Sequence, residues 1–276
     1  MKKYWLALAS FFLFLNLSGC IEMPQDQENI TDVRNPSATA EQPGTSQETV
    51  TETGTSTFIT ETAEPEHSDL HMPDYTLQQV REYFQEVVLK TEYSDGTGDN
   101  TLIQKWIIPL RYRIYGTTTE EDMAVLDDLF ARLNAVPGFP GIYEAEAGVE
   151  ETISIYFLDQ DSFNEKFQDF FGGEDAYGGT RYWYYTDTNE IYTAYIGYRT
   201  DIDQQTRSSI LVEEIINVLG ITDTVLREDS IVYQYSNENM TLSDIDWLIV
   251  KLLYDPAIQP GMDADRCAEV LQELYY

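Results

Sequence analysis

Oxygen-bearing side chains recur at regular spacing between residues 213 and 223. Glu213, Glu214 and Asn217 lie on an amphipathic segment that Gly220 ends, and Asp223 follows three residues later. Residues four apart share one face of a helix, so Glu213 and Asn217 should point the same way. A glycine with positive φ can turn the chain and bring Asp223 back toward them. Three such oxygen donors suit weakly bound Ca²⁺, Mg²⁺ or Mn²⁺.

This spacing resembles the zinc-protease pattern H-E-x-x-H-x-x-G-x-x-H. Glu214 stands at the position of the general-base glutamate and Gly220 at that of the turn glycine, whereas the three histidine positions hold Glu213, Asn217 and Asp223. Zinc prefers imidazole or thiolate to carboxylate and amide ligands. We therefore expect no tight zinc site and no cofactor beyond a weakly bound Ca²⁺, Mg²⁺ or Mn²⁺.

The resemblance continues downstream, into segments that are similar to the metzincin proteases. Ser230-Ile231-Val232-Tyr233 resembles their tight Met-turn with Val232 at the methionine position, and residues 242–254 resemble the helix L-S-x-x-D-x-x-x-I-x-x-L-Y that follows it. The similarity covers about residues 105 to 256. It implies a zincin-like or metzincin-like mixed sheet with an active-site-type helix, and a cleft whose floor is Val232 and Tyr233.

The chain also resembles a family of bacterial lipoproteins known as domain of unknown function 2927. The shared features are a tryptophan before a strand, an E-E-x-x-Q/N-x-L-G core and two segments near the end of the chain. They stand here as residues 106–110, 213–220, 252–256 and 260–262. This resemblance implies a fold and assigns no chemistry.

The first 73 residues predict export and anchoring. Lys2 and Lys3 precede an uncharged apolar run that is too short to span a bilayer comfortably. Small residues then lead to Cys20, as in a lipobox, so we expect residues 1–19 to be a signal peptide and Cys20 to carry the lipid. Residues 20–73 are rich in Thr, Ser and Glu and predict a disordered tether. The expected location is extracytoplasmic, anchored to the bacterial cell membrane.

The two histidines and the second cysteine carry no catalytic expectation. His67 and His71 belong to the tether, where neighbouring prolines argue against the helix that their spacing would need to bind a metal. Cys267 has no histidine partner in the folded part of the chain, so we expect an inert thiol near a helix end and no intramolecular disulfide.

Residues 74–276 have the apolar content of one folded domain of the α/β (α+β) class. Periodicity predicts the order helix, strand, helix, strand, helix, two strands, helix, helix. The predicted helices cover residues 76–90, 161–171 and 204–219. Two more are predicted, one from Thr118 or Thr119 to about Leu133 and one from Thr241 or Ser243 to Tyr254. The predicted strands cover residues 110–115, 152–158, 181–185 and 190–198, the last two forming a hairpin. No glycine-rich phosphate loop follows any strand, which excludes a doubly wound nucleotide-binding fold.

The charge and the aromatic residues of the chain limit the kinds of molecule that it can bind. The net charge of −33 excludes nucleic acid and anionic lipid surfaces and favours cations or basic peptides. The hairpin carries Tyr184, Tyr192 and Tyr195, which could line a groove for a peptide or a sugar, although tyrosine is also favoured on half-exposed strands for structural reasons.

Three functions remain open from the sequence. The first is a degenerate metalloprotease-like domain, without enzymatic activity, that binds a peptide or another component of the cell envelope. The second is a hydrolase with an oxygen-ligated metal and Glu214 as its base. The third is a structural or carbohydrate-contacting envelope lipoprotein that uses the aromatic hairpin.

Overall fold

The computed structural model describes residues 70, 72–89, 102–167 and 176–275. The chain divides after Thr60 into two units, and all described residues belong to the second, Glu61–Tyr276. The predicted signal peptide, the lipidation site Cys20 and most of the predicted tether lie outside the described residues. Among the described residues, no helix is both long enough and apolar enough to cross a membrane.

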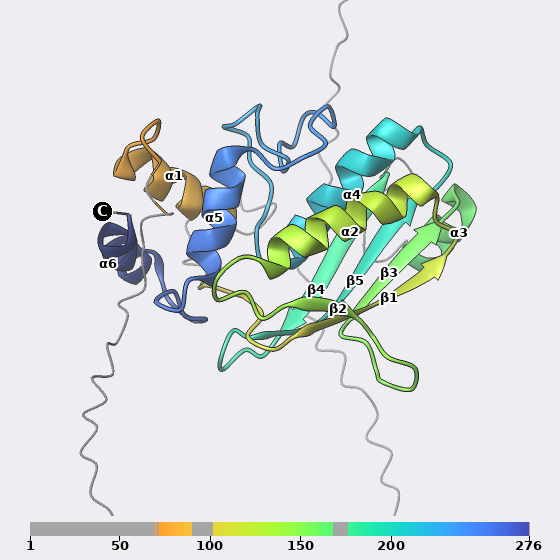
Figure 1. Cartoon of the computed structure of the whole chain (residues 1–276), viewed down its shortest axis with the longest axis horizontal. Helices are drawn as coiled ribbons and strands as arrows, with labels where there is room; N and C mark the ends of the chain where they lie inside the picture. Colours follow the sequence, from red (N-terminus) through yellow and green to blue (C-terminus); the bar gives the residue numbers. More distant parts are fainter. Residues whose placement is uncertain (1–69, 71, 90–101, 168–175, 276) are drawn as a thin grey trace, which may run out of the picture. The chain divides into compact units, whose positions relative to one another are not determined.

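A five-stranded mixed sheet forms the centre of the described unit (Figure 1). Its strands are β1 (Leu110–Gly116), β2 (Ile142–Glu144), β3 (Ile153–Leu158), β4 (Gly178–Tyr184) and β5 (Ile191–Arg199). Their order is β2-β1-β3-β5-β4, with β4 antiparallel to β5 and the other pairs parallel. The mixed sheet predicted from the sequence is therefore confirmed, and β4 is an edge strand.

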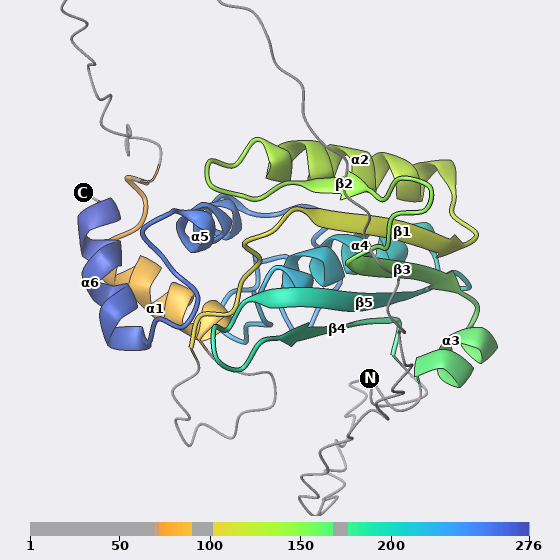
Figure 2. The same cartoon turned by 90° about the horizontal axis from the view of Figure 1, so that it is seen from below.

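The described residues also form six helices. They are α1 (Leu77–Val88), α2 (Glu120–Asn134), α3 (Gln160–Phe167), α4 (Gln204–Val218), α5 (Asp244–Tyr254) and α6 (Ala264–Leu274). Thr76, Thr119 and Ser243 each begin a helix with a capping box, which explains why the predicted starts were nearly correct. Helices α2 and α4 pack side by side along the sheet, while α1, α5 and α6 gather at one end of it (Figures 1 and 2).

The structure differs from the predicted element list at β2, at α6 and at the start of the hairpin. Strand β2 and helix α6 were not predicted. The predicted helix over residues 161–171 is described from Gln160 to Phe167, and its remainder lies outside the described residues. The hairpin is confirmed, with a first strand that begins earlier than predicted and a loop whose Asn189 adopts a φ of 60°.

An ion pair buried between α2 and α4 joins the beginnings of these two helices. Asp122 is 1% exposed and Arg207 is 9% exposed. Asp122 also accepts hydrogen bonds from the Thr119 main-chain N–H at 2.8 Å and from Gln204 Nε2 at 2.9 Å. Every oxygen of this carboxylate therefore has a partner, as burial of a charge requires.

A second buried charge, Lys105, holds the segment after α5. Its ammonium donates to the carbonyl oxygens of Leu253, at 2.9 Å, and of Ile258. Burial lowers the pKa of Lys105 to about 8. The thiol of Cys267 on α6 is also buried, and burial raises its pKa to about 12, so this thiol is protonated and unreactive at neutral pH.

Candidate functional site

Helix α4 carries Glu213, Glu214 and Asn217, and the chain leaves it at Gly220, where a side chain would clash with a neighbouring carbonyl. Asp203 begins the helix by accepting a hydrogen bond from the Thr206 main-chain N–H at 3.0 Å. Gly220, just past the end of α4, has a φ of +94°, and a Cβ at this position would lie 2.2 Å from the carbonyl oxygen of Gln104. The chain must therefore turn here, as the spacing predicts.

Two buried aromatic side chains hold this end of α4. Trp106 Nε1 donates to the carbonyl oxygen of Val218 at 2.8 Å, and the Tyr254 hydroxyl donates to that of Leu219 at 3.0 Å. Both rings are 1% exposed. They satisfy carbonyls that have no partner within the helix, so the last turn of α4 is fixed in place.

The turn at Gly220 places Asp223 beside Asn217. Asn217 Nδ2 donates to Asp223 Oδ1 at 3.3 Å. The other amide atom, Asn217 Oδ1, is buried and has no hydrogen-bond partner among the described residues. Two of the three residues at the predicted ligand positions therefore contact each other directly.

Glu213 and Glu214 lie one to two turns before the end of α4. Glu214 is 8% exposed, and its main-chain carbonyl accepts a hydrogen bond from Thr180 Oγ1 of β4 at 2.9 Å. A Cβ at Gly178 would lie 3.2 Å from Glu214 Oε1, so this side chain approaches the start of β4. Glu213 is half-buried. Burial first, and then the charges of Glu214 and Glu213, raise the pKa of the buried Tyr198.

The segment predicted to form the floor of a cleft pairs with the chain that follows Asp223. The Thr224 N–H donates to the Val232 carbonyl at 2.8 Å, and the Gln234 N–H donates to the Thr224 carbonyl at 3.0 Å. The Val232 side chain is buried and Tyr233 is half-buried. Residues 230–233 thus form a turn against Thr224 and no regular strand.

A buried acid that the sequence reasoning missed fixes Thr224 to α1. Glu86 Oε1 accepts hydrogen bonds from Thr224 Oγ1 at 2.9 Å and from the Val225 N–H at 3.2 Å. Glu86 is 4% exposed. The signal was available, because Glu86 falls among Tyr83, Phe84 and Val87 on the apolar face of α1.

A second missed acid, Asp246 of α5, holds the turn at residues 230–233. The hydroxyls of Tyr83 and Ser230 each lie 2.8 Å from Asp246 Oδ1. Asp246 Oδ2 accepts from the N–H groups of Ile231 and Ser243, both at 3.0 Å. Asp246 is 4% exposed, so α1, the turn and α5 meet at one buried carboxylate.

The three hairpin tyrosines that were predicted to line a groove each contact different residues. Tyr195 is 38% exposed and meets Trp183 edge to face at 5.3 Å between ring centroids. Tyr192 stacks on Tyr185 at 4.5 Å. Tyr184, 37% exposed, lies opposite Ile191 beyond an irregularity in the strand pairing. Tyr192 and Tyr195 therefore contact different aromatic rings. Tyr184 is paired across the two strands with Ile191, a residue of the core.

The donor chemistry of the site limits what it could hold. Asn217 supplies an amide, and one carboxylate oxygen of Asp223 already accepts a hydrogen bond from it. Across the described ranges, no group of three or more His, Cys, Asp or Glu side chains is arranged to hold a metal ion. A cation at Glu213, Asn217 and Asp223 would need water or a ligand to complete its shell.

A family of proteins matches most of the folded part of the chain. Residues 77–273 match the sequence profile of a family described as "Protein of unknown function (DUF2927)". No curated protein matches the chain. The matched region includes α1, the sheet, α4 and the segment that follows α4, and it begins after the predicted tether.

Proposed function

The chain belongs to the DUF2927 family of proteins of unknown function, and from its own residues we propose that it is a binding domain with a degenerate, metzincin-like site. The observation that carries this proposal is the contact between Asn217 and Asp223. Where a zinc protease has two imidazole ligands, the amide of Asn217 here donates a hydrogen bond to the carboxylate of Asp223. A site of this kind lacks the imidazole ligands on which the chemistry of a zinc protease depends.

Three backbone features support the comparison with metzincins. Gly220 turns the chain after α4, Asp223 returns to Asn217, and a short turn at residues 230–233 lies against Thr224. Helix α5 follows and holds that turn through Asp246. These features follow one another along the chain in the same order as the motifs of the resemblance, which supports the proposal.

The proposed ligand is an extended peptide or a peptide-bearing component of the cell envelope. Strand β4 lies at the sheet edge and next to α4, because Thr180 contacts the Glu214 carbonyl. An edge strand presents main-chain N–H and C=O groups with which a peptide can pair. The net charge of −33 favours peptides with basic side chains over acidic ones.

One observation favours the alternative, a hydrolase that uses an oxygen-ligated metal. Asn217 Oδ1 is buried and without a hydrogen-bond partner among the described residues, so it is an acceptor that Ca²⁺, Mg²⁺ or Mn²⁺ could use. Glu214 would then be the general base. A carbohydrate ligand on Tyr192 and Tyr195 of the hairpin is the remaining alternative.

We expect the protein to bind extended peptides without cleaving them. A library of basic and acidic peptides is incubated with the chelator-treated protein, with Zn²⁺, Mn²⁺ or Ca²⁺ added separately, and analysed by native mass spectrometry. Intact basic peptides should appear as complexes, and no fragments should form, because two carboxylates and an amide would cancel the charge that lets zinc activate water.

Glu214→Gln is the matched control for this assay. Cleavage that needs one ion and vanishes in Glu214→Gln would establish the hydrolase in place of the binding domain. Complexes with neither class of peptide would contradict peptide binding and leave the carbohydrate alternative.

We also propose that the mature protein is a lipoprotein anchored outside the cytoplasm through Cys20. Radiolabelled palmitate should label the wild-type chain, and Cys20→Ala should remove the label completely, because the lipobox contains a single thiol. Cys267→Ala is the matched control and should retain the label, since this thiol is buried in α6. Equal labelling of wild type and Cys20→Ala would contradict the anchor.

A further inference from the structure

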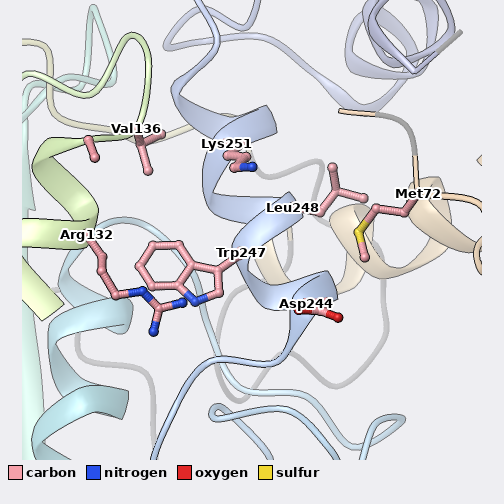
Figure 3. A pocket seen from close by; sticks show the side chains of 8 residues that line it. Met72, Arg132, Val136, Asp244, Trp247, Leu248 and Lys251 are labelled. Carbon is pink, nitrogen blue, oxygen red and sulfur yellow. The ribbon is translucent and has the colours of Figure 1, made fainter. Parts of the chain in front are cut away.

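A pocket of about 470 Å³ lies between the end of α2 and helix α5 (Figure 3). Its wall includes Met72, Arg132, Val136, Trp247, Leu248 and Lys251. This volume is in the range of pockets that hold small organic molecules. None of Glu213, Glu214, Asn217 and Asp223 lines the pocket, so a ligand bound in it would be independent of the proposed peptide site.

The pocket gathers two positive charges in a strongly acidic chain. The whole sequence has 16 basic residues against 49 acidic ones. Neither Arg132 nor Lys251 forms an ion pair within the described part of the chain. Each lies in the last turn of its helix, where a cation offsets the helix dipole. The helix dipole therefore explains why each of these two cations stands where it does. It does not explain why an aromatic side chain with an N–H donor lies beside both of them.

That aromatic donor is Trp247, four residues before Lys251 and so on the same face of α5. The guanidinium of Arg132 lies over its ring at 4.2 Å from the centroid. Figure 3 shows the ring between Arg132 and the α5 backbone. Trp247 Nε1 is buried and has no hydrogen-bond partner among the described residues. A buried N–H of this kind is normally satisfied, so an acceptor on a ligand would complete it once the side chains that cover it turn aside.

The other residues that line the pocket indicate what the uncharged part of the ligand is like. Met72, Val136 and Leu248 supply apolar surface for a hydrocarbon or aromatic body. Asp244, on the first turn of α5, also lines the pocket and would repel a second negative charge. We propose that this pocket binds a small monocarboxylic acid with an apolar or aromatic body, its carboxylate held by Arg132, Lys251 and the Trp247 indole N–H.

The test follows the indole N–H signals of the chain. The full-length chain carrying Cys20→Ala is labelled with ¹⁵N-tryptophan, which gives one indole signal for each of the four tryptophans. Trp247→Phe assigns the signal of Trp247. Titration with 3-phenylpropionate should shift the Trp247 signal saturably and leave that of the buried Trp106 in place. No shift of the Trp247 signal up to millimolar ligand would overturn the proposal.

Substitutions and uncharged analogues test the role of each group. Lys251→Gln and Arg132→Gln should each raise the dissociation constant about tenfold, because each removes a charge-assisted hydrogen bond. Arg266→Gln, an exposed arginine of α6 outside the pocket, should leave it unchanged. The alcohol 3-phenylpropanol and inorganic phosphate should both bind at least about tenfold more weakly. Equal binding of the alcohol would refute the carboxylate contact, and equal binding of phosphate would refute the apolar contact.

Discussion

Asp246→Ala is expected to lower the free energy of unfolding by about 3 to 5 kcal/mol, because it removes the acceptor of several buried donors at once. Tyr83, Ser230 and the Ile231 N–H would lose a partner in a region closed to solvent. Ser243 would also lose the acceptor for its hydroxyl at the start of α5. Urea unfolding followed by circular dichroism measures the change.

Asp244→Ala is the matched control for this experiment, since Asp244 is an exposed acid on the same first turn of α5. It should cost no more than about 1 kcal/mol, the value of a charge at a helix start. Asp246→Asn should fall between the two, because it keeps one acceptor and places an amide toward the N–H groups of Ile231 and Ser243. If Asp246→Ala and Asp244→Ala lose the same stability, the buried carboxylate does not organise this region.

Arg207→Ala should destabilise the protein by a similar amount, about 3 to 5 kcal/mol, because it leaves the carboxylate of Asp122 buried without its counter-charge. The loss should appear as a lower urea midpoint with an unchanged slope. The double substitution Asp122→Ala with Arg207→Ala should cost less than the sum of the single ones by about 1 to 3 kcal/mol, since the two groups are in contact.

The exposed pair Arg266 and Glu269 provides the comparison. Its side chains are 57% and 67% exposed, and they contact each other at 2.7 Å on α6. Arg266→Ala should change the free energy of unfolding by less than about 1 kcal/mol, as is usual for surface pairs. Additive effects at Asp122 and Arg207, or equal losses in the two pairs, would contradict the idea that burial makes the first pair important.

Local sequence signals were sufficient for most of the fold. Thr76, Thr119 and Ser243 marked helix starts because capping boxes depend on neighbouring residues. Strand β2 could not be found in this way, because its three residues are paired with β1 only through the tertiary structure. Helix α6 could have been found: Cys267, Val270, Leu271 and Leu274 recur at helical spacing and are all buried.

The candidate site was predicted in part, because only some of its contacts depend on residues that are close together in the sequence. The neighbourhood of Asn217 and Asp223 follows from helix spacing and a single glycine, so the sequence was sufficient. Glu86 and Asp246 are distant from Asn217 along the chain. Their carboxylates accept hydrogen bonds from the segment that follows α4 only because the chain folds. The pocket at Trp247 likewise joins Met72, α2 and α5, which no local pattern connects.

The hydrogen bonds that fix the last turn of α4 are accepted by main-chain carbonyl oxygens. Trp106 and Tyr254 bind the oxygens of Val218 and Leu219, and every residue type has such an oxygen. Substitution of the polar side chains in this turn leaves these bonds intact, whereas loss of either aromatic donor or of Gly220 does not. During divergence, therefore, positions 213, 217 and 223 can gain or lose chemistry by single substitutions while the backbone that carries them keeps its place.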